Sequence, residues 1–307
     1  MAYNEEANIG KLLQALLRQQ ITSCRLQEIV VVASGCTDQT VPIAQAQAAR
    51  DPQITVLVQA RREGKAAAIN LFLQHARAAD IIVLESADTL PADEHTVEYL
   101  LRPLFAKADV GMTGAHPIPL DRADHFLGFI VQLQWRLHHR IALISPKLGE
   151  MVAFKNVLPE IPADTAVDEA CIEALLAPKG YRLEYVAAAR VYNKGPETVA
   201  DFLKQRRRIA AGHHHLRQTQ HYAVSTLSLR RILPALRAEL EWSPRFLLWT
   251  MGMILLEGYG RLLGMVDFYL KKKNPFTWEM AATTKNLNTE EVRRDSYEKS
   301  DGSNSHV

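Results

Sequence analysis

Residues 28–38 read EIVVVASGCTD, a short apolar run that ends in small and polar residues. An apolar run of this length, rich in β-branched residues, predicts a strand that is buried on both faces. Such strands are typical of parallel sheets covered by helices. The residues after the run, Ser34 to Asp38, then lie at the carboxyl end of a strand, where open α/β sheets bind their ligands.

The rest of the first half repeats this alternation of helix and strand. Apolar residues at helical spacing precede the run, from Ile9 to Leu17. The sequence therefore predicts an α/β fold, with a mostly parallel sheet and helices on both faces. With 307 residues, 48% of them hydrophobic, the chain suits one large domain with a helical appendage. Further strands are predicted at 54–58, 80–85 and 110–114, and helices at 38–50, 64–77 and 96–105.

The second half is richer in long helical stretches. Residues 126–144 are amphipathic, 168–177 are helical, 182–186 resemble a strand, and 200–218 form a strongly basic helix. Residues 246–256 carry no charge, but eleven residues are too few to span a bilayer. We therefore expect an α/β domain over 1–222, a helical, membrane-associating segment over 223–284 and a disordered tail over 285–307.

Composition and charge exclude several classes of protein. The formal net charge is only +2, so no overall field favours nucleic acid as a partner. The three cysteines are too few and too scattered for a disulfide framework or a zinc site. Glu5 and Glu6 lie where a signal peptide would have its apolar core. We expect a cytoplasmic protein, with peripheral membrane contact at the inner face of the plasma membrane.

Six short motifs follow one another along residues 1 to 215: Ala2-Tyr3-Asn4-Glu5-Glu6, Ser34-Gly35-Cys36-Thr37-Asp38, Gly64-Lys65, Ser86-Ala87-Asp88, Asp168 and Gln205-Arg206-Arg207-Arg208. Together, in this order, they resemble glycosyltransferase family 2. The resemblance implies the A-type nucleotide-sugar-binding fold for the first 222 residues. It also implies inverting transfer of a sugar from a nucleotide-diphosphate donor to a polysaccharide, lipid-linked or other hydroxyl acceptor.

The donor's diphosphate needs positive charge and backbone N–H groups. Gly64 and Lys65 open a predicted helix, and Arg61 lies just before them. Glycine permits close approach of the backbone to a phosphate, and a helix start offers free N–H donors. Lys65 and Arg61 are therefore the expected diphosphate contacts, and solvated loop charges are the alternative.

By resemblance, the first loop receives the base and ribose of the donor, through Ala2, Tyr3, Asn4 and Glu5. Asn4 also fits as the N-cap of the helix that follows. The family commonly has two acidic residues where this chain has Ala33 and Ser34. We expect Ser34 to contact the nucleotide, and the loss of the acidic residues leaves the identity of the base open.

A divalent cation, Mn²⁺ or Mg²⁺, usually accompanies a diphosphate and prefers hard oxygen ligands. The family's Asp-x-Asp pattern corresponds here to Ser86-Ala87-Asp88. Asp88 is therefore the expected metal ligand and Ser86 a donor contact, with a turn or capping role as the alternative for Asp88. Glu85 comes one residue earlier, and alternation along the strand points it to the other face.

Transfer also needs a base that removes the proton of the acceptor hydroxyl. By resemblance, Asp168 at a helix start has this role, and Glu169 and Asp164 are the other candidates. Thr165 and Asp168 also resemble a helix capping box, which is a structural alternative.

Gln205 and Arg208 are three residues apart and share a helix face. They match two positions of the family's Gln-x-x-Arg-Trp motif, with Ile209 in place of tryptophan. We expect both residues in the active site, where Arg208 helps Lys65 to hold the diphosphate. The neighbouring basic residues also favour contact with an anion.

Three other classes of protein stay open at this point. One is a sugar nucleotidyltransferase, which would have a glycine-rich loop after its first strand. The second is a non-catalytic nucleotide-binding scaffold, favoured by the changes at Ala33, Ser34 and Ser86. The third is a membrane-surface interaction protein. We also expect a strand ahead of Ala2, because a sheet normally positions the first ligand loop of such a domain.

Overall fold

The structure is a computed structural model, and it describes residues 1–224, 228–272, 284, 285 and 287. The described residues form strands with helices between them, followed by a helical second half. The strands are β1 (Ile29–Ser34), β2 (Ile54–Gln59), β3 (Ile81–Glu85), β4 (Leu90–Pro91), β5 (Val110–Pro119), β6 (Met151–Lys155) and β7 (Arg182–Asn193). The helices are α1 (Ile9–Leu17), α2 (Thr40–Ala48), α3 (Lys65–His75), α4 (Thr96–Ala106), α5 (Phe126–Ile144), α6 (Asp168–Leu176), η1 (Ala177–Lys179), α7 (Val199–Gln220), α8 (Leu229–Ala238) and α9 (Pro244–Tyr269).

The sheet confirms the α/β fold but mixes strand directions. β1 pairs with β2 in parallel, and five further strands form a sheet in the order β3-β6-β5-β7-β4. In that sheet only β5 and β7 are parallel, while β6 runs antiparallel to both of its neighbours. The predicted mostly parallel pairing needs this correction. The loop after α5 returns the chain to the carboxyl ends of the strands before β6 begins, since Met151 pairs with Glu85, the last residue of β3.

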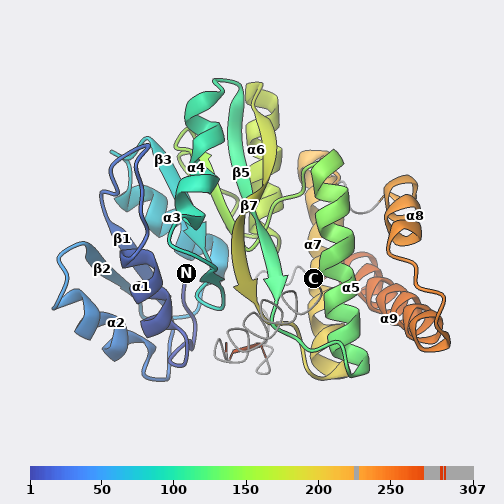
Figure 1. The fold of residues 1–307 in the computed structure, drawn as a ribbon. Helices are drawn as coiled ribbons and strands as arrows, with labels where there is room; N and C mark the ends of the chain where they lie inside the picture. The colour runs from blue at the N-terminus through green and yellow to red at the C-terminus, as the bar shows by residue number, and fades with distance from the viewer. Residues whose placement is uncertain (225–227, 273–283, 286, 288–307) are drawn as a thin grey trace, which may run out of the picture.

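Helices cover both faces of the five-stranded sheet, as predicted (Figure 1). On one face α3 and α6 bury Ile69 and Ile172 against Ile82 and Phe154. On the other face α4 packs on the sheet through buried apolar side chains, Leu100 among them. Burial of large apolar side chains is the main favourable contribution to this packing. The strands therefore hold the loops at their carboxyl ends in fixed positions.

The two sheets are joined through the start of the chain. The backbone N–H of Ala2 donates to Val32 at 2.9 Å, and its carbonyl accepts from Ser34 at 3.0 Å. On the other side, the carbonyl of Met1 accepts from the N–H of Ala87 at 3.0 Å. Met1 and Ala2 thus lie between β1 and β3, and the strand expected ahead of Ala2 stays a prediction.

The helical half stands beside the sheet, with α5 and α7 nearest to it and α8 and α9 outside (Figure 1). The α7 and α9 backbones approach closely at two glycines. A Cβ at Gly260 would lie 2.7 Å from Cβ of Arg206, and one at Gly264 would lie 2.5 Å from the carbonyl oxygen of Arg207. The uncharged run 246–256 lies within the longer helix α9, so the apolar helix is longer than the eleven residues considered in the sequence. By length and composition α9 qualifies as a candidate membrane span, and 22% of its most apolar window is buried.

Two residues of the expected disordered tail are described, and they pack on α1. Leu287 is fully buried, and its N–H donates to the side chain of Asn8 at 3.1 Å. The side chain of Asn8 in turn donates to the carbonyl of Lys285 at 2.7 Å. The rest of that tail, 288–307 and residue 286, lies outside the described residues.

The first turn of α4 is tied to the loop that follows α1 by one buried carboxylate. Glu98 is 3% exposed and accepts hydrogen bonds from the backbone N–H groups of Thr22 at 2.9 Å and Ser23 at 3.1 Å. Burial alone would raise the pKa of Glu98, but these donors and Arg102 lower it to about 2. A buried carboxylate with this many donors stabilises the fold in its charged form.

We predict that Glu98→Gln lowers the free energy of unfolding at pH 7 by about 1.5–3 kcal/mol, because the charged acceptor is lost. The folded pKa is depressed below 4.5, so the difference from wild type should be full above pH 4.5 and vanish as the pH falls towards 2. Denaturant unfolding at pH 7 and pH 3 measures it. Glu160→Gln, at an exposed position, is the control; matching losses in both variants would contradict the prediction.

Candidate active site

A lysine at the start of α3 joins two carboxylates at the start of α6. Nζ of Lys65 lies 2.6 Å from Oδ2 of Asp168 and 2.7 Å from Oε1 of Glu169. Gly64 precedes Lys65 with φ 95°, a backbone conformation that favours glycine, and α3 begins directly after it. The fold thus brings together side chains that are distant in the sequence, since Glu169 follows Lys65 by 104 positions.

The two carboxylates have different acidities. Burial, and then the charge of Glu169, raise the pKa of Asp168 above its ordinary value. Burial would also raise the pKa of Glu169, but Lys65 overrides it and lowers that pKa to about 2. Asp168 is therefore the more basic carboxylate of the pair. Of the base candidates named from the sequence, Asp164 is instead an exposed partner of His215 at 3.1 Å.

The carboxyl end of β3 adds the next charges. Asp88 lies partly buried in the turn after β3 with Ser86, and Glu85 accepts from the hydroxyl of Thr89 at 3.1 Å. Burial raises the pKa of Glu85 to about 8. Glu150, directly before β6, was not singled out in the sequence, because only the pairing of β3 with β6 brings it near Asp88.

Arg208 of α7 completes this cluster. Burial lowers the pKa of Arg208, while the charges of Asp168, Glu169 and Asp88 act in the opposite direction. The guanidinium therefore lies within electrostatic reach of all three carboxylates. Lys65, Asp88, Asp168 and Arg208, four residues predicted from the sequence, belong to one site.

The other basic residues of α7 do not all face this site, which corrects the predicted anion contact of the whole cluster. Arg207 forms an ion pair with Asp267 of α9. Arg206 lies 3.9 Å from Glu257, also on α9, and donates to Oε1 of Gln205 at 3.2 Å. These contacts hold α7 on α9, so they are structural. The contact of Gln205 with Arg206 likewise leaves its predicted place in the active site untested.

The first loop and the loop after β1 are joined to each other. Asn4 has φ 52°, and its Oδ1 accepts from the backbone N–H of Thr37 at 2.8 Å. Asn4 is therefore not an N-cap, because α1 begins only at Ile9. Asp38 accepts from the backbone N–H of Thr40, the first residue of α2, at 3.0 Å. This network fixes the edge of the loop where the resemblance places the donor's base.

Glu5 is a buried part of this loop. Its backbone N–H donates to the hydroxyl of Thr40 at 2.7 Å, and its carboxylate accepts from Asn8 at 3.0 Å and pairs with Lys285. Nζ of Lys285 also donates to the carbonyl of Tyr3 at 3.2 Å. Glu5 is 3% exposed, so its carboxylate stabilises the loop from the protein interior.

Tyr3 of the first loop stacks against the guanidinium group of Arg62. The guanidinium carbon of Arg62 lies 4.0 Å from the centre of the Tyr3 ring. A Cβ on Gly35, whose φ is 63°, would lie 2.5 Å from the backbone nitrogen of Arg62, so this glycine allows the two loops to meet. Arg61, the arginine named from the sequence, is exposed beside this pair. Ser34 is buried, and its hydroxyl makes no hydrogen bond within the described residues.

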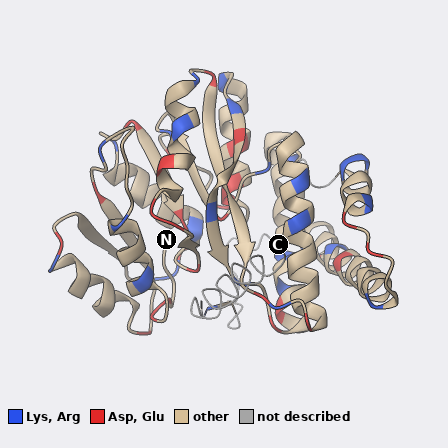
Figure 2. Cartoon of the chain, viewed as in Figure 1, with Lys and Arg blue, Asp and Glu red and all other residues tan. Residues whose placement is uncertain are grey.

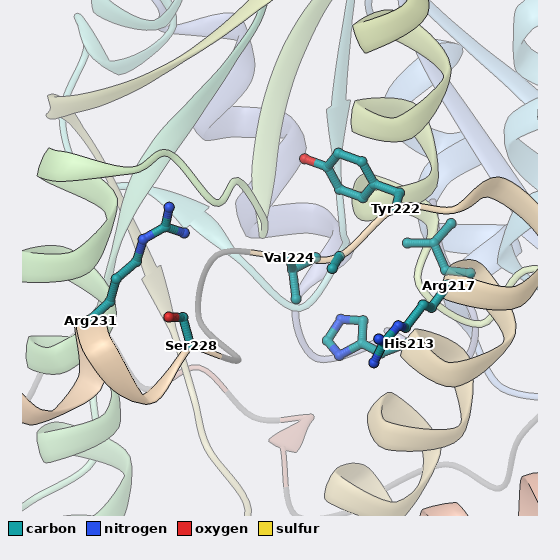
Figure 3. Close-up of a pocket in the computed structure, with 8 residues that line it drawn as sticks. His213, Arg217, Tyr222, Val224, Ser228 and Arg231 are labelled. Atoms are coloured by element: carbon teal, nitrogen blue, oxygen red, sulfur yellow. The ribbon is translucent and has the colours of Figure 1, made fainter.

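A cavity of about 430 Å³ lies at the far end of α7, and its lining side chains come from α7, the segment after it and the start of α8 (Figure 3). His213, Arg217, Tyr222 and Arg231 are among them. The hydroxyl of Tyr222 donates to Glu173 of α6 at 3.0 Å, which links the cavity wall to the helix that begins with Asp168.

Two family models match the chain, Glycosyl transferase family 2 over residues 1–126 and Glycosyl transferase family group 2 over residues 160–269. A comparison with curated proteins gives no match. The mannosyltransferase PcManGT from Pyrobaculum calidifontis, solved with GDP-Man and Mn²⁺, is 22% identical with a TM-score of 0.61, over 89% of this chain and 86% of that chain. Glucosyl-3-phosphoglycerate synthase from Mycobacterium tuberculosis, solved with Mn²⁺, uridine diphosphate and phosphoglyceric acid, is 18% identical with a TM-score of 0.50, over 69% and 74%.

The fold and these matches define an A-type glycosyltransferase with a helical C-terminal part. The chain belongs to glycosyltransferase family 2. It is therefore a transferase enzyme, and the resemblance noted from the order of its motifs is confirmed. The individual roles of the site residues stay predictions.

We predict that Lys65→Met lowers the free energy of unfolding by about 1–3 kcal/mol at pH 7, because it leaves the buried carboxylate of Asp168 and the partly buried carboxylate of Glu169 without their cation. Thermal or denaturant unfolding measures the loss, and Lys179→Met, at an exposed position of η1, is the control. The added loss should shrink as the pH falls and the carboxylates take up protons. Equal stability of Lys65→Met and wild type would show that the ion pair does not hold α3 to α6.

Proposed function

We propose that this enzyme moves a sugar from a nucleoside-diphosphate donor to a hydroxyl acceptor in one displacement that inverts the anomeric carbon. Asp168 is the base. The observation that carries the proposal is the place of Asp168 at the carboxyl ends of the strands, with a side chain only 7% exposed and a raised pKa. A carboxylate with a raised pKa is a better proton acceptor than an ordinary one.

The donor side of the site suits a diphosphate and a divalent cation. Asp88 offers the hard oxygen ligand that Mn²⁺ and Mg²⁺ prefer, and both solved proteins above are complexes with Mn²⁺. When bound, the cation supplies positive charge for the leaving diphosphate. Within the described part of the chain no three His, Cys, Asp or Glu side chains are grouped as a metal site. Diphosphate oxygens and water would complete the coordination.

The chain's own cations hold the rest of the donor. An ammonium group has three N–H donors. Glu169 accepts one of those of Lys65 at 2.7 Å, and Asp168 is its ion-pair partner at 2.6 Å, so a donor remains for a phosphate oxygen. Arg208 adds a second positive charge beside the carboxylates. The Tyr3 ring under Arg62 offers a flat surface for the nucleoside base.

The catalytic proposal is tested by Asp168→Asn. We expect the rate of sugar transfer to fall by about 10²- to 10⁴-fold, because the proton acceptor is lost, while the affinity for nucleoside diphosphate changes little. A panel of nucleotide sugars, assayed for release of the nucleoside diphosphate with and without acceptor, gives the rate, and calorimetry gives the affinity.

Asp164→Asn is the matched control, since Asp164 is exposed and pairs with His215 instead of Lys65. Full activity of Asp168→Asn with a normal melting temperature would overturn the role of the base. If only Asp168→Asn unfolds and Glu169→Gln loses transfer while folded, Glu169 is the base instead.

We further propose that α8 and α9 rest on a membrane surface, from the cytoplasmic side. Most of the large exposed apolar side chains in the described residues lie on these two helices and the segment between them; Trp242 is 85% exposed and Leu248 70%. Arg245 and the lysines 271 and 272 supply basic charge at the two ends of α9, and Figure 2 shows Lys and Arg on α8 next to it. An apolar helix face flanked by basic residues is typical of interfacial helices on anionic lipid.

The buried side of α9 indicates that this helix does not span the membrane. Phe246, Met253, Gly260 and Gly264 recur on one side of the helix and are buried, with both glycines against α7. This packing leaves only the outer side for lipid. A lipid-linked or membrane-bound glycan acceptor would then meet the enzyme at the surface on which it rests.

We predict that the protein floats with vesicles containing anionic lipid and that Leu248→Ser with Leu255→Ser lowers the bound fraction several-fold. These two side chains are 70% and 67% exposed, so their removal costs the fold little. Val58→Ser, which is 52% exposed on β2, is the control. Release by high salt and carbonate indicates peripheral binding; retention after carbonate indicates a span, and equal flotation of both variants contradicts the proposed surface.

A further inference from the structure

The cation site of this enzyme has one carboxylate fewer than the Asp-x-Asp pattern at the end of β3. Ser86 stands at the first position and Asp88 at the second. A hydroxyl is a much weaker ligand for a hard divalent cation than a carboxylate. The described residues near Asp88 therefore decide whether another oxygen can take the place of the first aspartate.

The pairing of β3 with β6 points to one candidate. The two strands are antiparallel, and their register ends with Glu85 opposite Met151. One position further along from each of these residues are Ser86 and Glu150. The N–H of Met151 donates to the carbonyl of Gly149 at 2.8 Å, so Glu150 lies in a tight turn directly beyond the last pair of this ladder. The pairing thus brings Glu150 to the end of β3, where Ser86 and Asp88 follow.

The surroundings of Glu150 are those of an acid that lacks a counter-charge of its own. Its carboxylate makes no hydrogen bond within the described residues. Burial first, and then the charges of Asp88 and Glu169, raise its pKa to about 7 against the opposing effect of Lys65 and Lys147. Among the charged groups around it, Asp88 acts on it most strongly.

The backbone of Glu150 is also unusual. Its φ is 62°, in the left-handed region that glycine occupies with less strain. A glutamate here has a conformational cost that a glycine would avoid, so the side chain is not explained by the local fold.

We propose that Glu150 supplies the carboxylate that Ser86 lacks, so that Asp88 and Glu150, from the facing ends of β3 and β6, hold the divalent cation together. This inference rests on the proposed function, because the cation is there to receive a donor diphosphate. A divalent cation between the two carboxylates offsets their mutual repulsion.

The test measures Mn²⁺ itself. Free Mn²⁺ is followed by electron paramagnetic resonance while wild type and variants are titrated, with uridine or guanosine diphosphate present at a fixed concentration. We expect Glu150→Gln to weaken Mn²⁺ binding at least tenfold and the double variant Ser86→Asp with Glu150→Gln to recover most of it. Glu160→Gln, at an exposed position, is the control, and Glu85→Gln tests the neighbouring carboxylate as the ligand instead.

Stability separates this role from a structural one. Glu150→Gly should lose Mn²⁺ binding as Glu150→Gln does, yet melt at the same or a higher temperature than wild type without metal, because the backbone strain is relieved. Unchanged Mn²⁺ affinity in Glu150→Gln, or a loss in Glu85→Gln instead, would overturn the inference. Wild type that binds neither nucleotide nor Mn²⁺ would instead refute the proposed function.

Discussion

The contact of Lys65 with Asp168 and Glu169 is the interaction on which the site depends. It joins the first residue of α3 to the first two residues of α6, at the edge where the strands end. The Asp168 side chain is only 7% exposed, and those of Lys65 and Glu169 are partly buried, so an unpaired carboxylate here would be costly. The same lysine lowers the pKa of Glu169 and leaves Asp168 as the more basic acid. The two ion pairs of Lys65 thus set both the geometry and the proton affinity of the site.

Much of this site could be predicted from the sequence, because its members belong to short motifs whose order follows the strands. Asp88, Asp168 and Arg208 each lie directly after a strand or on a helix, where local pattern places them. What the sequence could not provide is pairing between distant segments. Glu150 gains its position from the antiparallel return of β6, and no spacing in the chain encodes that return.

The same limit explains the residues whose roles changed. The basic run of α7 suggested anion contact, but Arg206 and Arg207 find their acidic partners on α9, which for Arg207 lies 60 positions later in the chain. A charge on a helix has no assigned partner until the helices pack. Their close approach at Gly260 and Gly264 decides which basic side chains remain for the active site and which side of α9 stays apolar and exposed.

The packing of Lys285 on the first loop, and of Leu287 on the start of α1, links two distant parts of the chain. Lys285 is the partner of the buried carboxylate of Glu5 and also contacts the carbonyl of Tyr3. A conformation without Lys285 at this place would leave the buried carboxylate of Glu5 without its cation. The conformation of the first loop and the docking of Lys285 are therefore coupled. By reciprocity, a nucleotide that rigidifies the loop would hold Lys285 in place to the same degree that Lys285 favours the nucleotide. Docking of Lys285 would then raise the affinity of the first loop for the nucleotide.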